Sequence, residues 1–393
     1  MNPIPRLRTY AGPALLSYGF RPFFLFGAIF AAGAVLLWLP MSSGELSMAT
    51  AFAPRDWHVH EMLYGYIAAV MTGFLLTAIP NWTGRLPIQG GPLLVLVAVW
   101  LAGRLVVALS ATIGWLPAAI VDVCFLVLVA AAAAREIAAG KNWRNLKIVA
   151  MIGLLLAGNI AFHIEAHLYG VADHGIRIGI AAMVLLITVI GGRIIPSFTR
   201  NWLARENPGP LPAPFARFDA IVIAMTAASL ALWVAAPASN WVALALAVTG
   251  LSQAARLLRW AGYRTLRDRL VLILHVGYVF IPLGFLLVGA AASGIVPISA
   301  GLHAWTAGAA GLMTLAVMTR ASLGHTGQAL VASAETQLIY ALAAIATCAR
   351  IGAATVPQWN EPLLWLSGLA WAAAFIGFAI AYGPALWGRR KAI

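Results

Sequence analysis

Seven of the eight histidines of this chain lie in four short polar clusters within an otherwise apolar sequence. Imidazole nitrogens bind copper, zinc and haem iron, and they also carry protons near neutral pH. The clusters are WHVHE at 57–61, NIAFHIEAH at 159–167, the separate histidines His275 and His303, and RASLGHTG at 320–327. Since ionisable side chains are costly at membrane depth, histidines gathered in such a sequence indicate a functional site.

The other side chains of the sequence limit which metals such a site would take. Cys124 and Cys348 are the two cysteines, and they form no CxxC pattern. Imidazoles without thiolates and with few carboxylates favour copper, haem iron or zinc over calcium or magnesium. Because the covalent attachment motif CxxCH is missing from the sequence, any haem is expected to be noncovalent haem b.

Composition predicts the class of protein that positions these histidines. The chain is 62% hydrophobic and 9% charged, whereas a soluble domain carries roughly 25% charged residues. Apolar runs of about 20 residues, long enough to cross the bilayer as helices, recur from end to end. The sequence therefore predicts an all-α, polytopic membrane bundle. Its twelve expected spans are 20–39, 60–79, 92–110, 117–139, 146–170, 175–195, 217–236, 240–260, 269–291, 299–319, 334–354 and 361–386.

Lysine and arginine residues predict the orientation of these spans. Of the 25 basic residues, 21 fall on the side of the membrane that holds the N-terminus. Cytoplasmic loops are enriched in Lys and Arg, so both termini are expected in the cytoplasm. The net charge of +13 reflects this asymmetry and does not indicate a nucleic-acid partner, because no soluble domain is predicted to present it.

A proline-rich break at 206–216 is expected to be a cytoplasmic linker. It separates helices 1–6, within 1–205, from helices 7–12, within 217–393. No residue-level repeat relates the two groups of six helices, so a single membrane domain over 1–393 is predicted.

The predicted orientation gives each histidine a depth. His58, His60 and Glu61 stand at the periplasmic mouth of the second span, His163 lies in the last turns of the fifth, and His303 lies in the first turn of the tenth. Three helices therefore bring imidazoles to one periplasmic level. We expect His58, His60, His163 and His303 to form a metal centre there, and His163 and His303 are also candidate haem ligands.

A second level is expected near the cytoplasm. His275 and His325 lie on this side, and Arg193 and Arg320 end the sixth and tenth spans. Two imidazoles could bind haem iron axially while guanidinium groups hold the propionates. The alternative is that the arginines are only positive-inside anchors and that His325 only forms hydrogen bonds.

One pair of opposite charges is predicted within the membrane. Arg104 lies about as far from the periplasmic end of the third span as Asp122 does in the fourth, so a tight hairpin would place both at one depth. An ion pair is expected. The alternative is that Arg104 holds a haem propionate.

Five motifs in this order resemble the NnrS family, and the resemblance covers most of the chain, from Gly19 to Gly327. The motifs are GFRPFF, WHVHEMLYGY, GGRIIPSFT, HVGYVFIPLGFLL and HAWTAGAAGLMTLAVMTRASLGHTG. The resemblance implies a twelve-span protein of the bacterial inner membrane that contains haem and copper and is linked to nitric oxide. It matches the family's histidines to His58, His60, His163, His275, His303 and His325.

The chemistry implied is the reduction of nitric oxide to nitrous oxide, an oxidoreductase activity that relieves nitrosative stress. Glu61 and Tyr64 are the candidate catalytic residues, as proton relays beside the metal centre. An unidentified electron donor would be needed, and lipid surrounds the protein. Two alternatives stay open: a protein that binds or senses nitric oxide without turnover, and a transporter.

Overall fold

The computed structural model describes residues 10–389, and within this range the chain forms helices and no β-strand. Twelve helices are long and apolar enough to cross a membrane, which confirms the predicted all-α, polytopic class. Residues 1–9 and 390–393 lie outside the described part, and the cytoplasmic location of both termini stays a prediction.

The twelve spans are α1 (Phe20–Ser42); α2 (Pro54–His60), η3 (Glu61–Ile67) and α3 (Ala68–Thr83) in succession; α4 (Gly91–Ala108); α6 (Trp115–Ala139); α7 (Leu146–Tyr169); α8 (Asp173–Glu206); α9 (Arg217–Ala235); α10 (Asn240–Leu258); α11 (Arg269–Ala292); α12 (Ile298–His303), η6 (Ala304–Gly311) and α13 (Leu312–Thr326) in succession; α14 (Ala334–Thr355); and α15 (Asn360–Trp387).

The second span begins earlier than the apolar pattern predicts. It starts at Pro54, a residue suited to the first helical position, with Asp56 in the first turn. The apolar run begins only near residue 60, because the first turns carry polar side chains, of which Asp56 and His60 are buried. His58 and His60 are therefore helical residues.

Contacts divide the described residues into two compact units. Unit 1 contains the residues up to Gly179, Met318–Ala329, and Phe375 onward, whereas unit 2 contains Ile180–Val317 and Leu330–Ala374. Helices α8, α13 and α15 contribute residues to both. The non-helical segment 207–216 lies wholly within unit 2. The single membrane domain stays a prediction.

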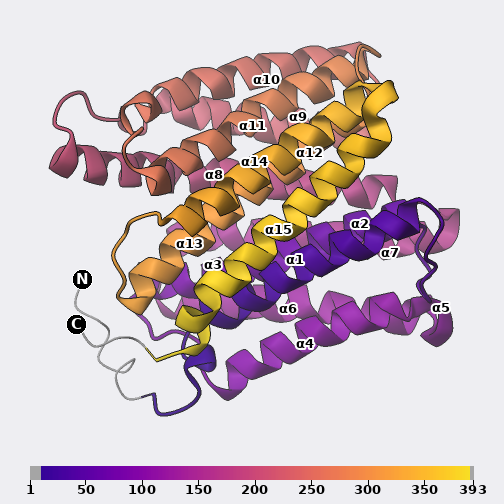
Figure 1. Ribbon diagram of the computed structural model, residues 1–393, viewed down its shortest axis with the longest axis horizontal. Helices are drawn as coiled ribbons and strands as arrows, with labels where there is room; N and C mark the ends of the chain where they lie inside the picture. The colour runs from indigo at the N-terminus through magenta and orange to yellow at the C-terminus, as the bar shows by residue number, and fades with distance from the viewer. Residues whose placement is uncertain (1–9, 390–393) are drawn as a thin grey trace. The chain divides into compact units, whose positions relative to one another are not determined.

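Unit 1 is built on close helix packing around aromatic side chains. Helix α1 packs on α3, and α6 packs on both α4 and α7 (Figure 1). Gly73 in α3 faces α1, where an added Cβ would lie 2.9 Å from Phe23 Cβ and 3.0 Å from the Phe24 ring. Small residues at such contacts let helix backbones approach each other.

The arginine of the GFRPFF motif caps a helix of the same unit. Arg21 is buried, and its Nη1 donates to the carbonyl oxygens of Leu386 at 2.9 Å and Gly388 at 2.7 Å, at the end of α15. The last carbonyls of a helix lack backbone partners and carry partial negative charge. A guanidinium group therefore satisfies them.

Two spans contain a π-helical segment, and each segment begins directly after a histidine. Glu61 of η3 follows His60, and Ala304 of η6 follows His303. π segments are rare and occur often at functional sites.

Corresponding positions of the two π-containing spans are separated by the same number of residues. The spacing is 243 residues from His60 to His303, from Thr83 to Thr326 at the span ends, and from Gly91 to Ala334, where the next helices begin. Gly84 and Gly327, also 243 residues apart, both end their spans at positive φ, +69° and +77°. Spans 2 and 10 therefore share one local pattern: a histidine, a π segment directly after it, and a glycine with positive φ at the end of the span.

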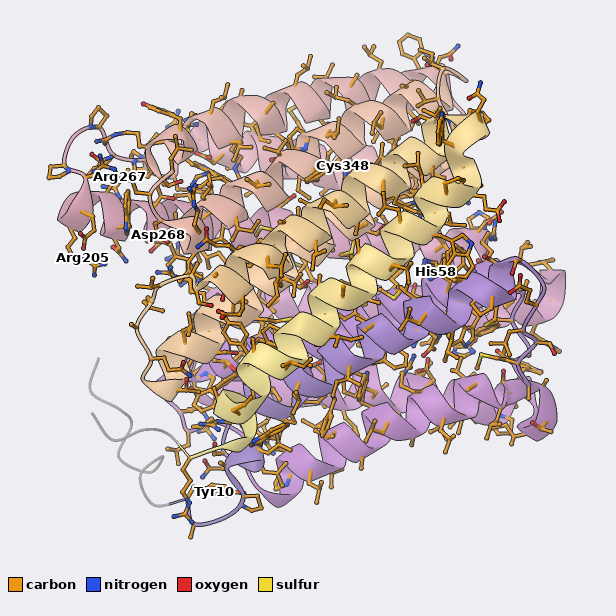
Figure 2. The ribbon with its side chains drawn as sticks, in the orientation of Figure 1. Tyr10, His58, Arg205, Arg267, Asp268 and Cys348 are labelled. Atoms are coloured by element: carbon orange, nitrogen blue, oxygen red, sulfur yellow. The ribbon has the colours of Figure 1, made fainter. Side chains whose placement is uncertain are left out.

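In unit 2, helix α10 packs against both α9 and α11 (Figure 1). Arg256 is buried there, 3.2 Å from Asp219 Oδ1 and 3.1 Å from the Tyr278 hydroxyl. Gly192 allows this arrangement, since a Cβ would lie against the guanidinium group. Figure 2 labels Arg205, in the last turn of α8, and Arg267 and Asp268, which directly precede α11.

Candidate functional site

Six polar side chains from four spans are buried together in unit 1, and none exposes more than 7% of its surface. They are termed the central cluster and are His60, Glu61, Arg104, Asp122, Asn159 and His163. They come from the junction of α2 with η3, from α4, from α6 and from α7. Because buried charges are stable only when paired and hydrogen-bonded, their mutual contacts define the site.

Arg104 joins the two carboxylates of the central cluster. Its Nη1 donates to Glu61 Oε1 at 2.5 Å and its Nη2 donates to Asp122 Oδ1. The ion pair between Arg104 and Asp122, predicted from their equal depth, is confirmed. Gly65 makes room for the guanidinium group, because an added Cβ would lie 2.8 Å from Nη1.

Asn159 connects the carboxylate of Asp122 to the imidazole of His60. Its Nδ2 donates to Asp122 Oδ2 at 2.8 Å, and its Oδ1 lies 3.1 Å from His60 Nε2. His60 Nδ1 lies 2.9 Å from Glu61 Oε1. Both ring nitrogens of His60 thus face oxygen acceptors, so both carry hydrogen in this arrangement.

This hydrogen-bond pattern gives the central cluster a balanced charge. Glu61 and Asp122 contribute two negative charges, which Arg104 and a doubly protonated His60 offset. A metal cation that replaced the hydrogen on His60 Nε2 would also supply positive charge to the buried carboxylates. The cluster is therefore suited to hold either a proton or a cation at the same nitrogen.

Three residues of the central cluster could bind one metal ion. His60, Asp122 and His163 each offer a ligand atom, and these atoms all lie within 4.8 Å of one another. His163 Nε2 is 3.0 Å from Asp122 Oδ2. Glu61 meets the other nitrogen of His60, as carboxylates do behind metal-bound histidines. Two imidazoles and one carboxylate suit copper, zinc or non-haem iron.

Aromatic rings enclose the histidines. The rings of Phe52 and Phe162 lie 5.1 Å and 5.0 Å from His60, measured between centroids. The Tyr64 ring is 5.3 Å from His60, and its hydroxyl donates to the Gly175 carbonyl oxygen at 2.7 Å. Apolar walls lower the local dielectric and strengthen electrostatic interactions inside the cluster. Tyr64, a predicted catalytic residue, thus adjoins the cluster while its proton points to Gly175.

Not every predicted ligand of unit 1 joins the central cluster. The structure brings His60 and His163 together, but His58 is half-buried and stacks on Trp38 with 4.3 Å between ring centroids. Two residues along an α-helix rotate the side chain by about 200°, so His58 and His60 face opposite directions. The role of His58 as a metal ligand stays a prediction.

His325 and Arg320 of α13 also belong to unit 1, and both are half-buried. The His325 ring packs against Tyr18 and Phe20, with 5.4 Å between centroids in each case. Burial raises the pKa of Tyr18 to about 12, so its hydroxyl stays protonated near neutrality. The haem-binding roles of His325 and Arg320 stay predictions.

Three further predicted residues lie in unit 2. His303 is half-buried and donates from Nδ1 to the Ser299 carbonyl oxygen at 2.7 Å. His275 is buried, with Nε2 2.8 Å from Thr199 Oγ1, and Arg193 is an exposed residue of α8. The shared centre of His303 with His60, and the pairing of His275 with His325, join different units and stay predictions.

Neither Asp122 nor Asn159 was among the predicted metal ligands. Asp122 was predicted only as the ion-pair partner of Arg104. Its distance from the end of its span, on which that prediction rests, also places its carboxylate at the depth of the last turns of α7. Asn159 precedes His163 by four residues, which puts both side chains on one helix face. That spacing was the available signal for Asn159.

The chain was compared with curated proteins and with models of protein families. No curated protein matches the chain. The family model described as NnrS protein matches residues 14–390, nearly the whole length, including every residue of the central cluster. The chain belongs to the NnrS family.

Proposed function

We propose that this protein contains haem b and copper and reduces nitric oxide to nitrous oxide at the central cluster, near the periplasmic face of the bacterial inner membrane. Membership of the NnrS family supports a nitric oxide-related membrane protein of this cofactor class. The observation that carries the proposal is the buried set of His60, Asp122 and His163, with ligand atoms within 4.8 Å of one another.

The donor set is chemically suited to a redox metal. Two imidazoles and a carboxylate bind copper well, and the same set is typical of non-haem iron. The bound metal would supply an electron and an open coordination position to nitric oxide. Joining two nitric oxide molecules into nitrous oxide and water consumes two electrons and two protons, and an electron donor must supply the former. Nitric oxide is small and apolar, so it can arrive through lipid.

The residues around the donors hold them in place. Glu61 accepts from His60 Nδ1, which directs Nε2 toward Asp122 and His163. Arg104 keeps both carboxylates paired. In this proposal Glu61 also holds a proton during turnover, and Tyr64 lies three residues further along η3.

A haem site completes the proposal. His275 and His325 are its candidate axial ligands, and Arg193 and Arg320 are the candidate partners of its propionates. A guanidinium group binds a carboxylate with two parallel hydrogen bonds, which suits this role.

One observation favours the alternative of binding without turnover. The hydroxyl of Tyr64 donates to the Gly175 carbonyl oxygen, and Glu61 is paired with both Arg104 and His60. Proton donors engaged in this way suit a protein that captures nitric oxide and does not reduce it.

The test uses the purified full-length protein. Metal analysis should find copper, and the pyridine haemochromogen spectrum should find haem b; reduced protein should then form nitrous oxide from nitric oxide. His60→Ala and His163→Ala should lose copper and activity. The control is His167→Ala, because His167 is exposed and stacks on Trp115 outside the cluster.

Each result bears on a different part of the proposal. Iron in place of copper, lost in the same two variants, would identify a non-haem iron centre and overturn the copper assignment. Bound nitric oxide without nitrous oxide would favour the binding protein. Unchanged metal in both variants would refute the site.

A further inference from the structure

Thr199 fixes the imidazole of His275 in one tautomer. His275 of α11 is 6% exposed, and its Nε2 lies 2.8 Å from the Thr199 hydroxyl oxygen. That hydroxyl donates its single hydrogen to the Ile195 carbonyl oxygen at 2.8 Å. With its hydrogen directed there, the hydroxyl accepts from His275, so the hydrogen of the neutral ring is on Nε2 and Nδ1 carries a lone pair.

The Nδ1 atom of His275 is buried and finds no hydrogen-bond partner among residues 10–389. Most buried nitrogen and oxygen atoms in proteins have a partner, and an exception calls for an explanation. Nε2 already has a hydrogen-bond partner in the fully buried hydroxyl of Thr199. A ligand bound to Nδ1 would give the second ring nitrogen a partner as well.

Gly262 supports the ring without covering that lone pair. An added Cβ would lie 2.5 Å from Nδ1, 2.7 Å from Cγ and 3.0 Å from Cε1 of His275. The lone pair of Nδ1 points away from Cγ and Cε1 in the ring plane, so an atom on its axis would be about 1 Å farther from both carbons than from Nδ1. The shorter distances place the glycine against the ring face.

A single nitrogen limits the kind of metal it can hold. In the described chain, the groups of three or more His, Cys, Asp or Glu side chains close enough to share an ion do not include His275. An imidazole alone suits a metal that brings its other ligands with it, as haem iron does with four porphyrin nitrogens.

We propose that His275 binds haem iron through Nδ1, with Thr199 and Gly262 as the positioning residues that select this nitrogen. The inference rests on the proposed function, which takes haem b as a cofactor. It adds the ligating atom and the two residues that present it, and it requires contacts of unit 2 alone.

The first experiment compares variants in the purified protein by haem content and by the visible and electron paramagnetic resonance spectra. Thr199→Val removes the acceptor and should weaken haem binding about 10- to 100-fold, as losses behind metal ligands do. Thr199→Ser keeps the hydroxyl and should retain the spectrum. The matched control is Thr347→Val, since Thr347 is equally buried in unit 2 and donates to the Ala343 carbonyl oxygen.

A second pair of variants tests the ring face. Gly262→Ala should displace the imidazole and lower haem content, whereas Gly33→Ala adds the same methyl group where nothing lies within 4 Å and should have no effect. Equal haem content in Thr199→Val, Gly262→Ala and the controls would overturn the positioning roles.

Small ligands show which nitrogen binds. In His275→Gly, added imidazole should restore the lost spectral component, because it can donate to Thr199 from one nitrogen and bind iron with the other. Adding Thr199→Val to this variant should then lower the affinity for imidazole but leave the affinity for 1-methylimidazole unchanged, since 1-methylimidazole has no N–H to donate. Equal effects on both ligands would refute the tautomer argument.

The outcomes separate the two proposals. Wild-type protein without haem would refute the proposed cofactor and with it this inference. Wild-type protein with haem whose spectrum is unchanged in His275→Ala would refute this inference alone. Where His275→Ala does not fold, the comparisons of Thr199→Val with Thr199→Ser and of Gly262→Ala with Gly33→Ala test the same inference.

Discussion

The side-chain amide of Asn159 donates to Asp122 Oδ2 at 2.8 Å, and this hydrogen bond turns the amide oxygen toward His60 Nε2. An amide can present either an acceptor or a donor to its neighbour. Its contact with a carboxylate, which only accepts, selects the acceptor for His60. One residue of α7 therefore decides how an imidazole of α2 and a carboxylate of α6 face each other.

Replacing Asn159 by Leu should lower metal affinity by about 10- to 100-fold, because Asp122 and His60 lose the group that orients them. Metal titration of the stripped protein measures this change. Asn81→Leu is the control, since the amide of Asn81 donates to the Thr77 carbonyl oxygen of its own helix. Unaltered affinity in Asn159→Leu would show that the two ligands are oriented without the amide.

The charge balance of the central cluster predicts a coupling between Arg104 and Glu61. Arg104→Met leaves two buried carboxylates with too little positive charge and should destabilise the protein by about 3–5 kcal/mol. Adding Glu61→Gln removes one negative charge and should recover about 1–3 kcal/mol. Thermal unfolding in detergent compares the single and double variants. Strictly additive losses would mean that the two charges do not offset each other.

Those residues of the central cluster whose positions depend only on the distance from the end of a span could be predicted from the sequence. Arg104 and Asp122 lie on neighbouring spans joined by a short turn, so equal distance from the turn placed them together. His163 could be placed at a helix end from its position in the apolar run. Span limits alone sufficed for both predictions.

Other features depend on tertiary packing and could not be predicted. The π segment after His60 has no sequence pattern of its own, and side-chain rotation, which turns His58 to Trp38, depends on neighbouring helices. The start of the second span at Pro54 was missed because its polar first turns are stabilised by protein contacts, which an apolar pattern does not reveal.

Arg21 should contribute more to stability than an exposed arginine that has an ion pair. Arg21→Met leaves the carbonyls of Leu386 and Gly388 without their donor and should cost about 1.5–3 kcal/mol, the range for hydrogen bonds to charged groups. Arg85→Met removes a partly exposed bridge to Glu136 and should cost at most about 1 kcal/mol. Thermal unfolding of the two variants gives the comparison, and equal losses would contradict the capping role.

If the protein reduces nitric oxide, Glu61 should affect the rate more than the metal content. Gln in its place keeps an oxygen that can accept from His60 Nδ1, so most of the copper should remain. The carboxylate charge behind His60, and with it the group that could hold a proton, is lost. We expect nitrous oxide formation to fall about 10- to 100-fold at equal haem and copper content.

The matched control for Glu61→Gln is Glu165→Gln, the same chemical change outside the central cluster. Glu165 is half-buried and contacts the His174 ring and the Gly175 backbone N–H. Its variant should keep the wild-type rate if protons reach the cluster through Glu61. A normal rate in Glu61→Gln with a reduced rate in Glu165→Gln would transfer the proton role to Glu165. Loss of copper in Glu61→Gln would instead show that copper binding by His60 needs the negative charge of the Glu61 carboxylate. Glu61 would then support the metal ligand and would not be assigned the proton role.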